Sequence, residues 1–249
     1  MSSKAYKLLQ LQYSKGSRDL DKKLLKMPLK ESREELVFLP PLMNKYKVTI
    51  ILNENSNENY YLRKSVAVLL MKAAKYFIEL GYTLRLESSY RSLIGQKEKF
   101  VKRYAEMKKS FPTKSKEELL KLANIYTAGI PILAAHTAGA GVDVILLNKS
   151  LKTLDFGCPY RHGDIESVTN YPKLSNVAKK NRKILKDGME KFDFMNYPFE
   201  YWHYSMGDVC AAYLKGELFA KFGPVEYDYH KGEIIQPKNK VDSYTYFSL

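Results

Sequence analysis

Two short segments carry the residue types that could hold a metal ion and perform hydrolysis. His136 and Asp143 lie at the two ends of a small-residue stretch that contains two glycines. Glycine lets the backbone turn sharply and pass close to a bound atom, so the imidazole and the carboxylate can converge on one point. A third ligand is available farther along the chain, because His203 ends the segment Glu200-Tyr201-Trp202-His203.

These three side chains form a donor set suited to a catalytic zinc site. His136, Asp143 and His203 would supply two imidazoles and one carboxylate and leave a position for water. The metal would lower the pKa of that water toward about 7. Neither cysteine has a Cys or His partner at ligand spacing, so the pattern does not favour a structural zinc site.

Two further residues could act on the water and on the substrate. Glu200 lies three residues before His203, and on a regular strand the two side chains would point to opposite faces. We therefore expect a bulge or turn that aims both inward. Glu200 could then take the proton from the metal-bound water and hand it to a leaving amine. Arg91, just after an expected strand, would stabilise the oxyanion.

Each of these residues also has an ordinary structural interpretation. His136 could be a hydrogen-bonded loop residue, Asp143 a turn residue and Arg91 an ion-pair partner. The aromatic residues around His203 could simply belong to the core. Spacing and composition alone therefore indicate a three-ligand metal hydrolase as one hypothesis, with a metal-holding binding module and a basic nucleic-acid binder as alternatives.

The same segments resemble a known family. The stretch from His136 to Asp143 resembles the Ser-x-His-x-x-Gly-x-Ala-x-Asp signature of the zinc D-Ala-D-Ala peptidases, and Glu200-x-Trp202-His203 resembles their Glu-x-Trp-His signature. The similarity covers roughly residues 55–223 and is nearest to the D-alanyl-D-alanine dipeptidases associated with vancomycin resistance (VanX-like). It implies one Zn²⁺ per chain on the three ligands, Glu200 as general base and Arg91 as electrostatic stabiliser.

The resemblance also implies a substrate site. The residues expected to line it are Tyr90, Ala134, Ala135, Cys158, Arg161 and Trp202. Three positions depart from the family pattern: Ala134 stands in place of a serine, Gly141 in place of an alanine, and Ser92 in place of a proline.

A fourth departure concerns the charge of the substrate site. Arg161 stands where the dipeptidases carry an aspartate that helps to hold the substrate's ammonium group. Its guanidinium would repel an ammonium and attract a carboxylate. Asp164 or Glu166 could take over the role of the aspartate if the loop is shifted.

The expected function is zinc-dependent hydrolysis of a short D-amino-acid peptide, in the first place D-alanyl-D-alanine. The alternative is a D,D-carboxypeptidase or muropeptide peptidase that acts on longer cell-wall peptides and needs no ammonium pocket. Arg161 favours the alternative, whereas the overall similarity favours the dipeptidase.

Hydrophobic patterning predicts the elements that must position these residues. Strands are expected over 48–52, 82–87 and 144–147, and helices over 4–13, 61–80, 93–109, 115–127, 173–192 and 209–222. Their order indicates one α+β domain with a small, mostly antiparallel central sheet flanked by helices, and the zinc site on the sheet. We expect an N-terminal arm over 1–40, a catalytic domain over 41–249, and a tail after Pro224 on the surface.

The composition limits which broad classes of protein this chain could belong to. The 249 residues are 45% hydrophobic and 13% aromatic, which is typical of a globular protein. The net charge is +14, but the lysines are scattered, so no nucleic-acid partner is expected. No apolar run is long enough for a membrane span, and we do not expect the N-terminal residues 1–30 to act as a secretory signal. With two cysteines, we expect a cytoplasmic enzyme whose partner is a small peptide containing D-alanine. The oligomeric state stays open.

Overall fold

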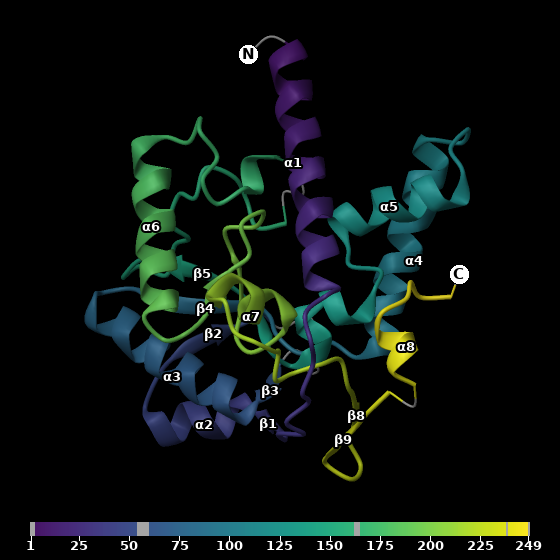
Figure 1. Cartoon of the computed structure of the whole chain (residues 1–249). Helices are drawn as coiled ribbons and strands as arrows, with labels where there is room; N and C mark the ends of the chain where they lie inside the picture. Colours follow the sequence, from purple (N-terminus) through teal and green to yellow (C-terminus); the bar gives the residue numbers. More distant parts are fainter. Residues whose placement is uncertain (1–2, 54–59, 162–164, 238, 249) are drawn as a thin grey trace.

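The computed structural model describes residues 3–53, 60–161, 165–237 and 239–248, and these form a central sheet surrounded by helices (Figure 1). The α-helices are α1 (Ser3–Leu24), α2 (Leu39–Tyr46), α3 (Lys64–Glu79), α4 (Leu93–Ser110), α5 (Lys116–Tyr126), α6 (Asn176–Glu190), α7 (Val209–Lys215) and α8 (Lys240–Ser243). The strands are β1 (Leu36–Phe38), β2 (Ile50–Leu52), β3 (Tyr61–Arg63), β4 (Thr83–Ser88), β5 (Gly141–Leu147), β6 (Met195–Asn196), β7 (His203–Ser205), β8 (Glu226–Asp228) and β9 (Glu233–Ile235). Short 3₁₀ helices are η2 (Pro131–Leu133), η3 (Ala135–Ala138) and η4 (Ile165–Ser167).

The central sheet has five strands in the order β2-β4-β5-β7-β6. Only the β2–β4 pair is parallel, and the other three pairs are antiparallel. All seven residues of β5 are buried, which explains its nearly continuous apolar run, because a strand covered on both faces needs apolar side chains on both. The predicted α+β class with a small, mostly antiparallel sheet is confirmed.

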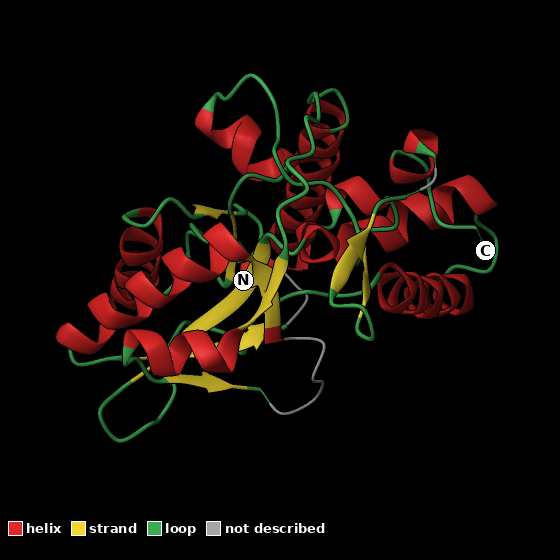
Figure 2. Cartoon of the chain, turned by 90° about the horizontal axis from the view of Figure 1, so that it is seen from below, coloured by secondary structure: helices red, strands yellow, loops and turns green. Residues whose placement is uncertain are grey.

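The main core lies between this sheet and the helices that enclose it (Figure 2). Leu70 and Phe77 of α3 are fully buried, as is Leu146 of β5. Helices α3 and α6 approach closely at Gly188, where an added Cβ would lie 2.3 Å from the Phe77 ring. The predicted amphipathic stripe of α3 therefore packs as expected.

Helix α1 stands between α6 and the α4–α5 pair (Figure 1), and it contacts α5, α7 and η4. It continues to Leu24, well beyond the predicted 4–13, because its second half has tertiary partners. The ring of Tyr13 packs on that of Phe199 at 5.3 Å, and a Cβ on Gly16 would come within 3.1 Å of the same phenylalanine. The boundary of the arm at residue 40 stays a prediction. Among the described helices, none has the length and hydropathy to span a bilayer.

Two further predicted helix boundaries are wrong. The helix predicted over 61–80 begins only at Lys64, because Tyr61–Arg63 pairs with β1 as strand β3. Arg63 is fully buried there and forms an ion pair with Glu31 at 3.2 Å, a long-range contact that local periodicity cannot indicate. The helix predicted over 209–222 ends at Lys215, because Gly216 adopts a left-handed φ of 73° that terminates it.

The tail after Pro224 lies partly in the core, so the prediction of a surface tail is wrong in part. Val225 is fully buried, and β8 and β9 form a hairpin beside it. Farther on, the ring of Phe247 lies 6.5 Å from that of Phe100, and its N–H donates to the carbonyl of Gly129 at 2.9 Å. The aromatic residues of the tail pack against apolar side chains, which its composition of charged and polar residues did not indicate.

Candidate metal centre

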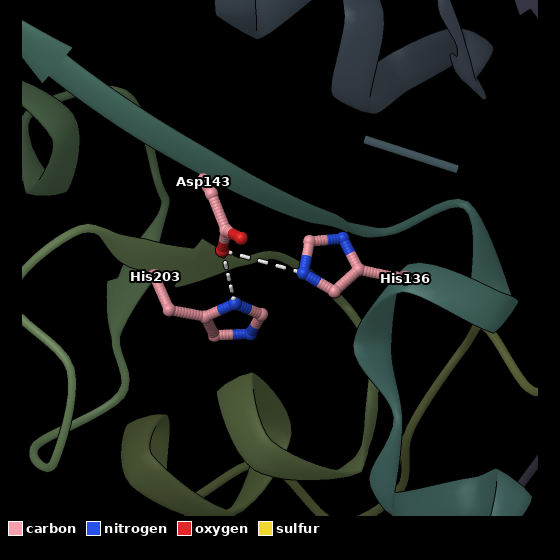
Figure 3. Close-up of side chains that lie close together, drawn as sticks. All are labelled: His136, Asp143 and His203. Carbon is pink, nitrogen blue, oxygen red and sulfur yellow. Dashed lines mark hydrogen bonds and ion pairs between the residues drawn. The ribbon is translucent and has the colours of Figure 1, made fainter. Parts of the chain in front are cut away.

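Three side chains that could bind a metal ion converge on the sheet (Figure 3). His136 comes from η3, Asp143 from β5 and His203 from the start of β7. One potential ligand atom from each lies within 4.8 Å of the others. Oδ1 of Asp143 lies 2.8 Å from Nδ1 of His203 and 3.3 Å from Nε2 of His136. The structure thus brings together the three residues that the sequence singled out.

Strand register and two glycines account for this convergence. Asp143 and His203 are directly opposite in the β5–β7 pair, so their side chains leave the same face of the sheet. The chain folds back so tightly after His136 that a Cβ on Gly141 would lie 2.8 Å from the Cβ of Ala135. Gly139 ends η3 with a φ of 65°, a conformation that glycine adopts without strain. The small-residue stretch is therefore a steric requirement of the site.

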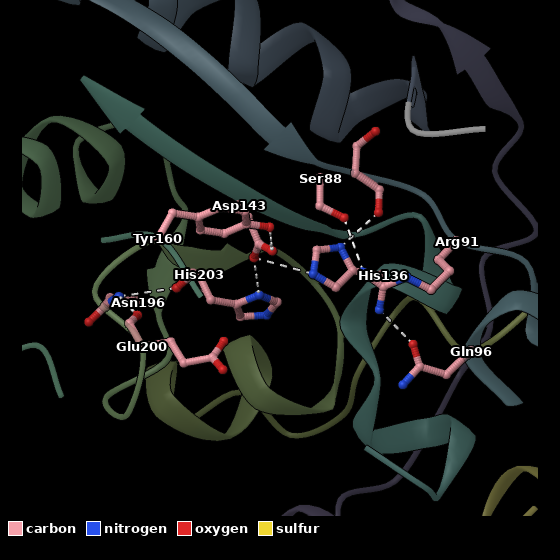
Figure 4. A network of polar contacts seen from close by, with 10 residues as sticks. Ser88, Arg91, Gln96, His136, Asp143, Tyr160, Asn196, Glu200 and His203 are labelled. Atoms are coloured by element: carbon pink, nitrogen blue, oxygen red, sulfur yellow. Dashed lines mark hydrogen bonds and ion pairs between the residues drawn. The ribbon is translucent and has the colours of Figure 1, made fainter. Parts of the chain in front are cut away.

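Neighbouring polar groups fix the orientation of two ligands (Figure 4). Nδ1 of His136 lies 2.7 Å from the carbonyl oxygen of Ser89, which leaves Nε2 facing Asp143. The Tyr160 hydroxyl donates to Oδ2 of Asp143 at 2.7 Å and leaves Oδ1 for the two imidazoles. Partners of this kind hold ligand side chains in a metal-binding orientation before the ion arrives.

The electrostatics favour the metal-binding protonation state for two of the three ligands, His136 and Asp143. Burial works to lower the pKa of His203, but the hydrogen bond and charge of Asp143 outweigh it and raise that pKa. Burial lowers the pKa of His136 to about 4, so its imidazole is neutral near pH 7. Burial works to raise the pKa of Asp143, but His136 and His203 outweigh it and hold that pKa well below its usual value. A neutral imidazole and an ionised carboxylate are the ligand forms of these groups.

The donor set fits a zinc ion. Two donors that each lie about 2.1 Å from a tetrahedral zinc ion are about 3.4 Å apart, close to the separation of Nε2 of His136 and Oδ1 of Asp143. Nδ1 of His203 lies closer to the same oxygen, at the 2.8 Å of a hydrogen bond. Within the part of the chain that the structure describes, no fourth Cys, His, Asp or Glu joins the group. Three protein ligands are typical of catalytic rather than structural zinc sites.

Glu200 lies on a turn that leads into His203, as expected from their spacing. The N–H of Glu200 donates to the carbonyl of Tyr197 at 3.1 Å, and the N–H of His203 donates to the carbonyl of Glu200 at 3.2 Å. The Asn196 amide donates to the carbonyls of both Glu200 and His203 and holds the turn (Figure 4). Burial, with help from Asp143, raises the pKa of Glu200 to about 7, which suits a general base working near neutral pH.

Arg91 lies three residues beyond the end of β4, and the pairing of β4 with β5 shifts register between Leu86 and Ser88. Its two terminal nitrogens donate to Oε1 of Gln96 at 2.7 Å and to Oγ of Ser88 at 3.1 Å (Figure 4). Its backbone N–H donates to the carbonyl of His136 at 3.0 Å. The guanidinium is therefore held beside the metal ligands.

These residues face a cavity of about 440 Å³. Four of the six side chains predicted to line a substrate site line it: Ala134, Ala135, Arg161 and Trp202. We call the side chains that α1, α4 and α5 contribute the outer wall. They are Tyr13, Asp21, Leu24, Gln96, Lys99, Lys102, Arg103, Glu106, Asn124, Ile125 and Tyr126.

Three other predicted positions lie elsewhere. Tyr90 is fully buried beside Val225, to whose carbonyl its hydroxyl donates at 3.2 Å, so its side chain belongs to the core beneath the tail. Cys158 lines a second, separate pocket, and its Sγ accepts a hydrogen bond from Arg182 at 3.5 Å. Glu166 does not line the cavity, and Asp164 is outside the described residues. We leave these residues out of the proposed site.

Reasoning from the sequence missed the groups that support the ligands and Arg91. Tyr160 stands next to Arg161 in the chain, but nothing in the spacing shows that its hydroxyl reaches Asp143. Gln96 lies in the first turn of α4, and the sequence gives no sign that its side chain binds Arg91. The contribution of α1 to the cavity was also missed, because it arises only from packing.

Comparison with known families gives an independent view of the chain. The family model for peptidase M15, described as D-Ala-D-Ala dipeptidase, matches residues 50–219. That range contains Arg91, the three candidate ligands and Glu200, and it excludes α1.

Individual relatives are distant. The D-alanyl-D-alanine dipeptidase of Enterococcus faecalis is 26% identical over 147 residues, which cover 58% of this chain and 72% of the relative. The enzyme of the same name from Escherichia coli is 23% identical over 97 residues, 39% of this chain and half of the relative. Among solved structures, the LD-carboxypeptidase LdcB is 19% identical, with a TM-score of 0.44 over 72% of this chain and 71% of that one.

Proposed function

We propose that this chain, which belongs to the peptidase M15 family of D-Ala-D-Ala dipeptidases and is therefore a metallopeptidase, hydrolyses a short D-amino-acid peptide with one bound zinc ion. The observation that carries the proposal is the convergence of His136, Asp143 and His203 in the wall of a cavity that Glu200 and Arg91 also line. Zinc at this site would supply Lewis-acid chemistry and lower the pKa of a bound water.

The roles of the other two residues follow from their positions. Glu200, with its pKa near 7, takes a proton from the attacking water and gives it to the departing amine. Arg91, held by Gln96 and Ser88, places positive charge where the carbonyl oxygen becomes negative. Trp202, Ala134 and Ala135 shape the adjoining part of the cavity.

D-alanyl-D-alanine is the first candidate substrate, since the curated relatives are dipeptidases for it. The free cysteines Cys158 and Cys210 support the proposed cytoplasmic location, because unpaired thiols suit a reducing compartment.

A specific observation favours a second candidate, a D,D-carboxypeptidase that acts on longer peptides. Arg161 lines the cavity with its guanidinium 4.9 Å from the Tyr160 ring centre. Arg91, Lys99 and Arg161 all line this cavity, and burial together with the two arginine charges lowers the pKa of Lys99 to about 8. Such a site repels a free ammonium beside the scissile bond and accepts a carboxylate.

Metal analysis combined with a small peptide panel tests both candidates. We expect one zinc per chain, loss of activity with a chelator and recovery with zinc. Turnover of D-Ala-D-Ala identifies the dipeptidase, and turnover of only Nα,Nε-diacetyl-L-Lys-D-Ala-D-Ala identifies the carboxypeptidase. A zinc-loaded chain that cleaves neither would contradict the proposed function.

A further inference from the structure

Helix α1 lies outside the range 50–219 that the family model matches, yet one of its faces packs on the turn that carries Glu200. We call this the packing face of α1, and it consists of Tyr13, Gly16 and Ser17. Residues three and four apart lie on the same side of a helix, so these three point in one direction. They contact two aromatic residues that come shortly before the candidate base in the chain.

The first of these aromatic residues is Phe199, which directly precedes Glu200. The ring of Tyr13 meets the ring of Phe199 edge-on, with 5.3 Å between ring centres. The backbone of α1 approaches the same ring at Gly16, where an added Cβ would lie 3.1 Å from Cζ of Phe199. The missing side chain at position 16 therefore allows the helix to pack closely on the residue beside the base.

The second aromatic residue is Tyr197. Its hydroxyl lies 3.2 Å from Oγ of Ser17, a residue that is only 2% exposed. Its ring packs edge-on against the rings of Phe199, at 5.4 Å, and His203, at 5.9 Å. Its backbone carbonyl accepts the N–H of Glu200 at 3.1 Å, and its own N–H donates to the carbonyl of His203 at 2.9 Å. Tyr197 thus connects α1 to the backbone on which the base is carried.

The turn is held by a second set of contacts near η4. The N–H of Thr169 donates to the carbonyl of Pro198 at 3.1 Å, and the N–H of Tyr201 donates to the carbonyl of Ser167 at 2.9 Å. These bonds fix the backbone of the turn, whereas α1 packs on its aromatic side chains. A general base must lie within hydrogen-bond reach of the proton that it removes, so a small displacement of Glu200 would reduce the rate.

We propose that the packing face of α1 is a positioning element for the general base: it holds Phe199 and Tyr197, and through them it keeps Glu200 in the orientation that proton transfer requires. The inference rests on the proposed function, because it assigns α1 a role in that reaction. The three candidate metal ligands come from η3, β5 and β7, so weakening the contact with α1 should leave zinc bound. The expected signature is a lower kcat with little change in KM.

A graded series at Gly16 separates positioning from stability. Alanine and valine both have a higher helix propensity than glycine, so Gly16→Ala and Gly16→Val add bulk toward Phe199 without weakening the helix itself. We expect kcat to fall by up to about 10²-fold, more with valine than with alanine, with zinc content and thermal stability retained. Lys15→Ala, at an exposed position of the same helix, is the control and should leave kcat unchanged.

Two further sets of variants test whether the effect passes through the turn. Phe199→Leu makes room for the added side chain and should restore part of the kcat that Gly16→Val loses. Ser17→Ala, which adds no bulk, should lower kcat in the same direction by removing the contact with Tyr197. In the Glu200→Ala chain, Gly16→Val should cause no further loss of the residual rate, because the group that it displaces is already absent.

Trp202 supplies a readout that does not depend on turnover. It is the only tryptophan in the chain and lies two residues after Glu200. Its fluorescence emission, or its quenching by acrylamide, should change in Gly16→Val and stay unchanged in Lys15→Ala.

An unchanged kcat in both Gly16→Val and Ser17→Ala, or an equal loss of rate with and without Glu200, would overturn the inference. If the parent chain hydrolyses no peptide, the proposed function fails and Trp202 alone decides. A changed signal would then still show that α1 holds the turn, and an unchanged signal would show that it does not.

Discussion

The metal centre and helix α1 differ in how their polar groups are held. At the metal centre, both oxygens of Asp143 have partners and Nδ1 of His136 is bound to a backbone carbonyl. On the outer wall, Asp21 has a single amide partner and no ion pair within the described residues. Groups that are already partnered are fixed in place for chemistry, whereas groups with free hydrogen-bonding capacity are available to a ligand.

This contrast predicts that substitutions at the metal centre reduce the rate, whereas substitution of Asp21 on α1 changes mainly the stability. The largest effect is expected at Glu200. Glu200→Ala should reduce kcat by about 10²-fold to 10⁴-fold, because the proton carrier is lost. Zinc content, measured by elemental analysis, should stay at one per chain. Glu117→Ala, in an exposed pair with Lys121 on α5, is the control. Survival of activity in Glu200→Ala would show that the base is misassigned.

Arg91 comes next. Arg91→Ala should lower kcat by about 10²-fold to 10³-fold with zinc retained, because the cation opposite the developing oxyanion is removed. Arg91→Lys keeps the charge but cannot hold both Gln96 and Ser88, so an intermediate loss is expected. Equal activity of the Ala and Lys variants would indicate that the charge at this position has no role.

Removal of the Tyr160 hydroxyl tests the support around Asp143. Tyr160→Phe should lower zinc affinity or activity by about 10-fold to 100-fold, the usual range for a group that orients a metal ligand. Zinc affinity is measured by competition with a chelator. Tyr76→Phe, whose ring packs on Phe192 away from the cavity, should change neither quantity. An unchanged zinc affinity and rate in Tyr160→Phe would show that the hydrogen bond to Asp143 contributes little to zinc binding or catalysis.

The smallest effect is expected on stability at the outer wall. Asp21 has a folded-state pKa of about 7 against an ordinary value of 3.8, so the folded chain holds this proton more tightly than the unfolded chain does. Stability should therefore fall as pH rises from about 4 to 7, and Asp21→Asn should remove that loss. The full shift corresponds to about 4 kcal/mol, and about 1–2 kcal/mol is expected for a partly exposed carboxyl.

Thermal unfolding of both chains at pH 5 and pH 8 measures this effect. The variant should gain more stability relative to the parent at pH 8 than at pH 5. An equal difference at both pH values would mean that Asp21 is solvated like a surface residue.

The amino-acid sequence alone determined the features that depend on neighbours in the chain. The spacing of His136 and Asp143, the turn between Glu200 and His203, and the capping box that begins α5 at Ser115 all follow from local chemistry. The long periodic helices and the apolar run of β5 were likewise predictable, because the spacing of apolar residues within each segment indicates which of its side chains are buried.

Only the tertiary structure decided which distant segments meet. The pairing of β5 with β7 puts His203 beside Asp143, and a loop brings the Tyr160 hydroxyl to the same carboxylate. Helix α1 contributes Asp21 to the lining of the cavity. The pairing of β1 with β3 overrode the helical periodicity at Tyr61–Arg63. These outcomes depend on burial and hydrogen bonding between residues far apart in the chain, and the pattern of neighbouring residues does not indicate such long-range interactions.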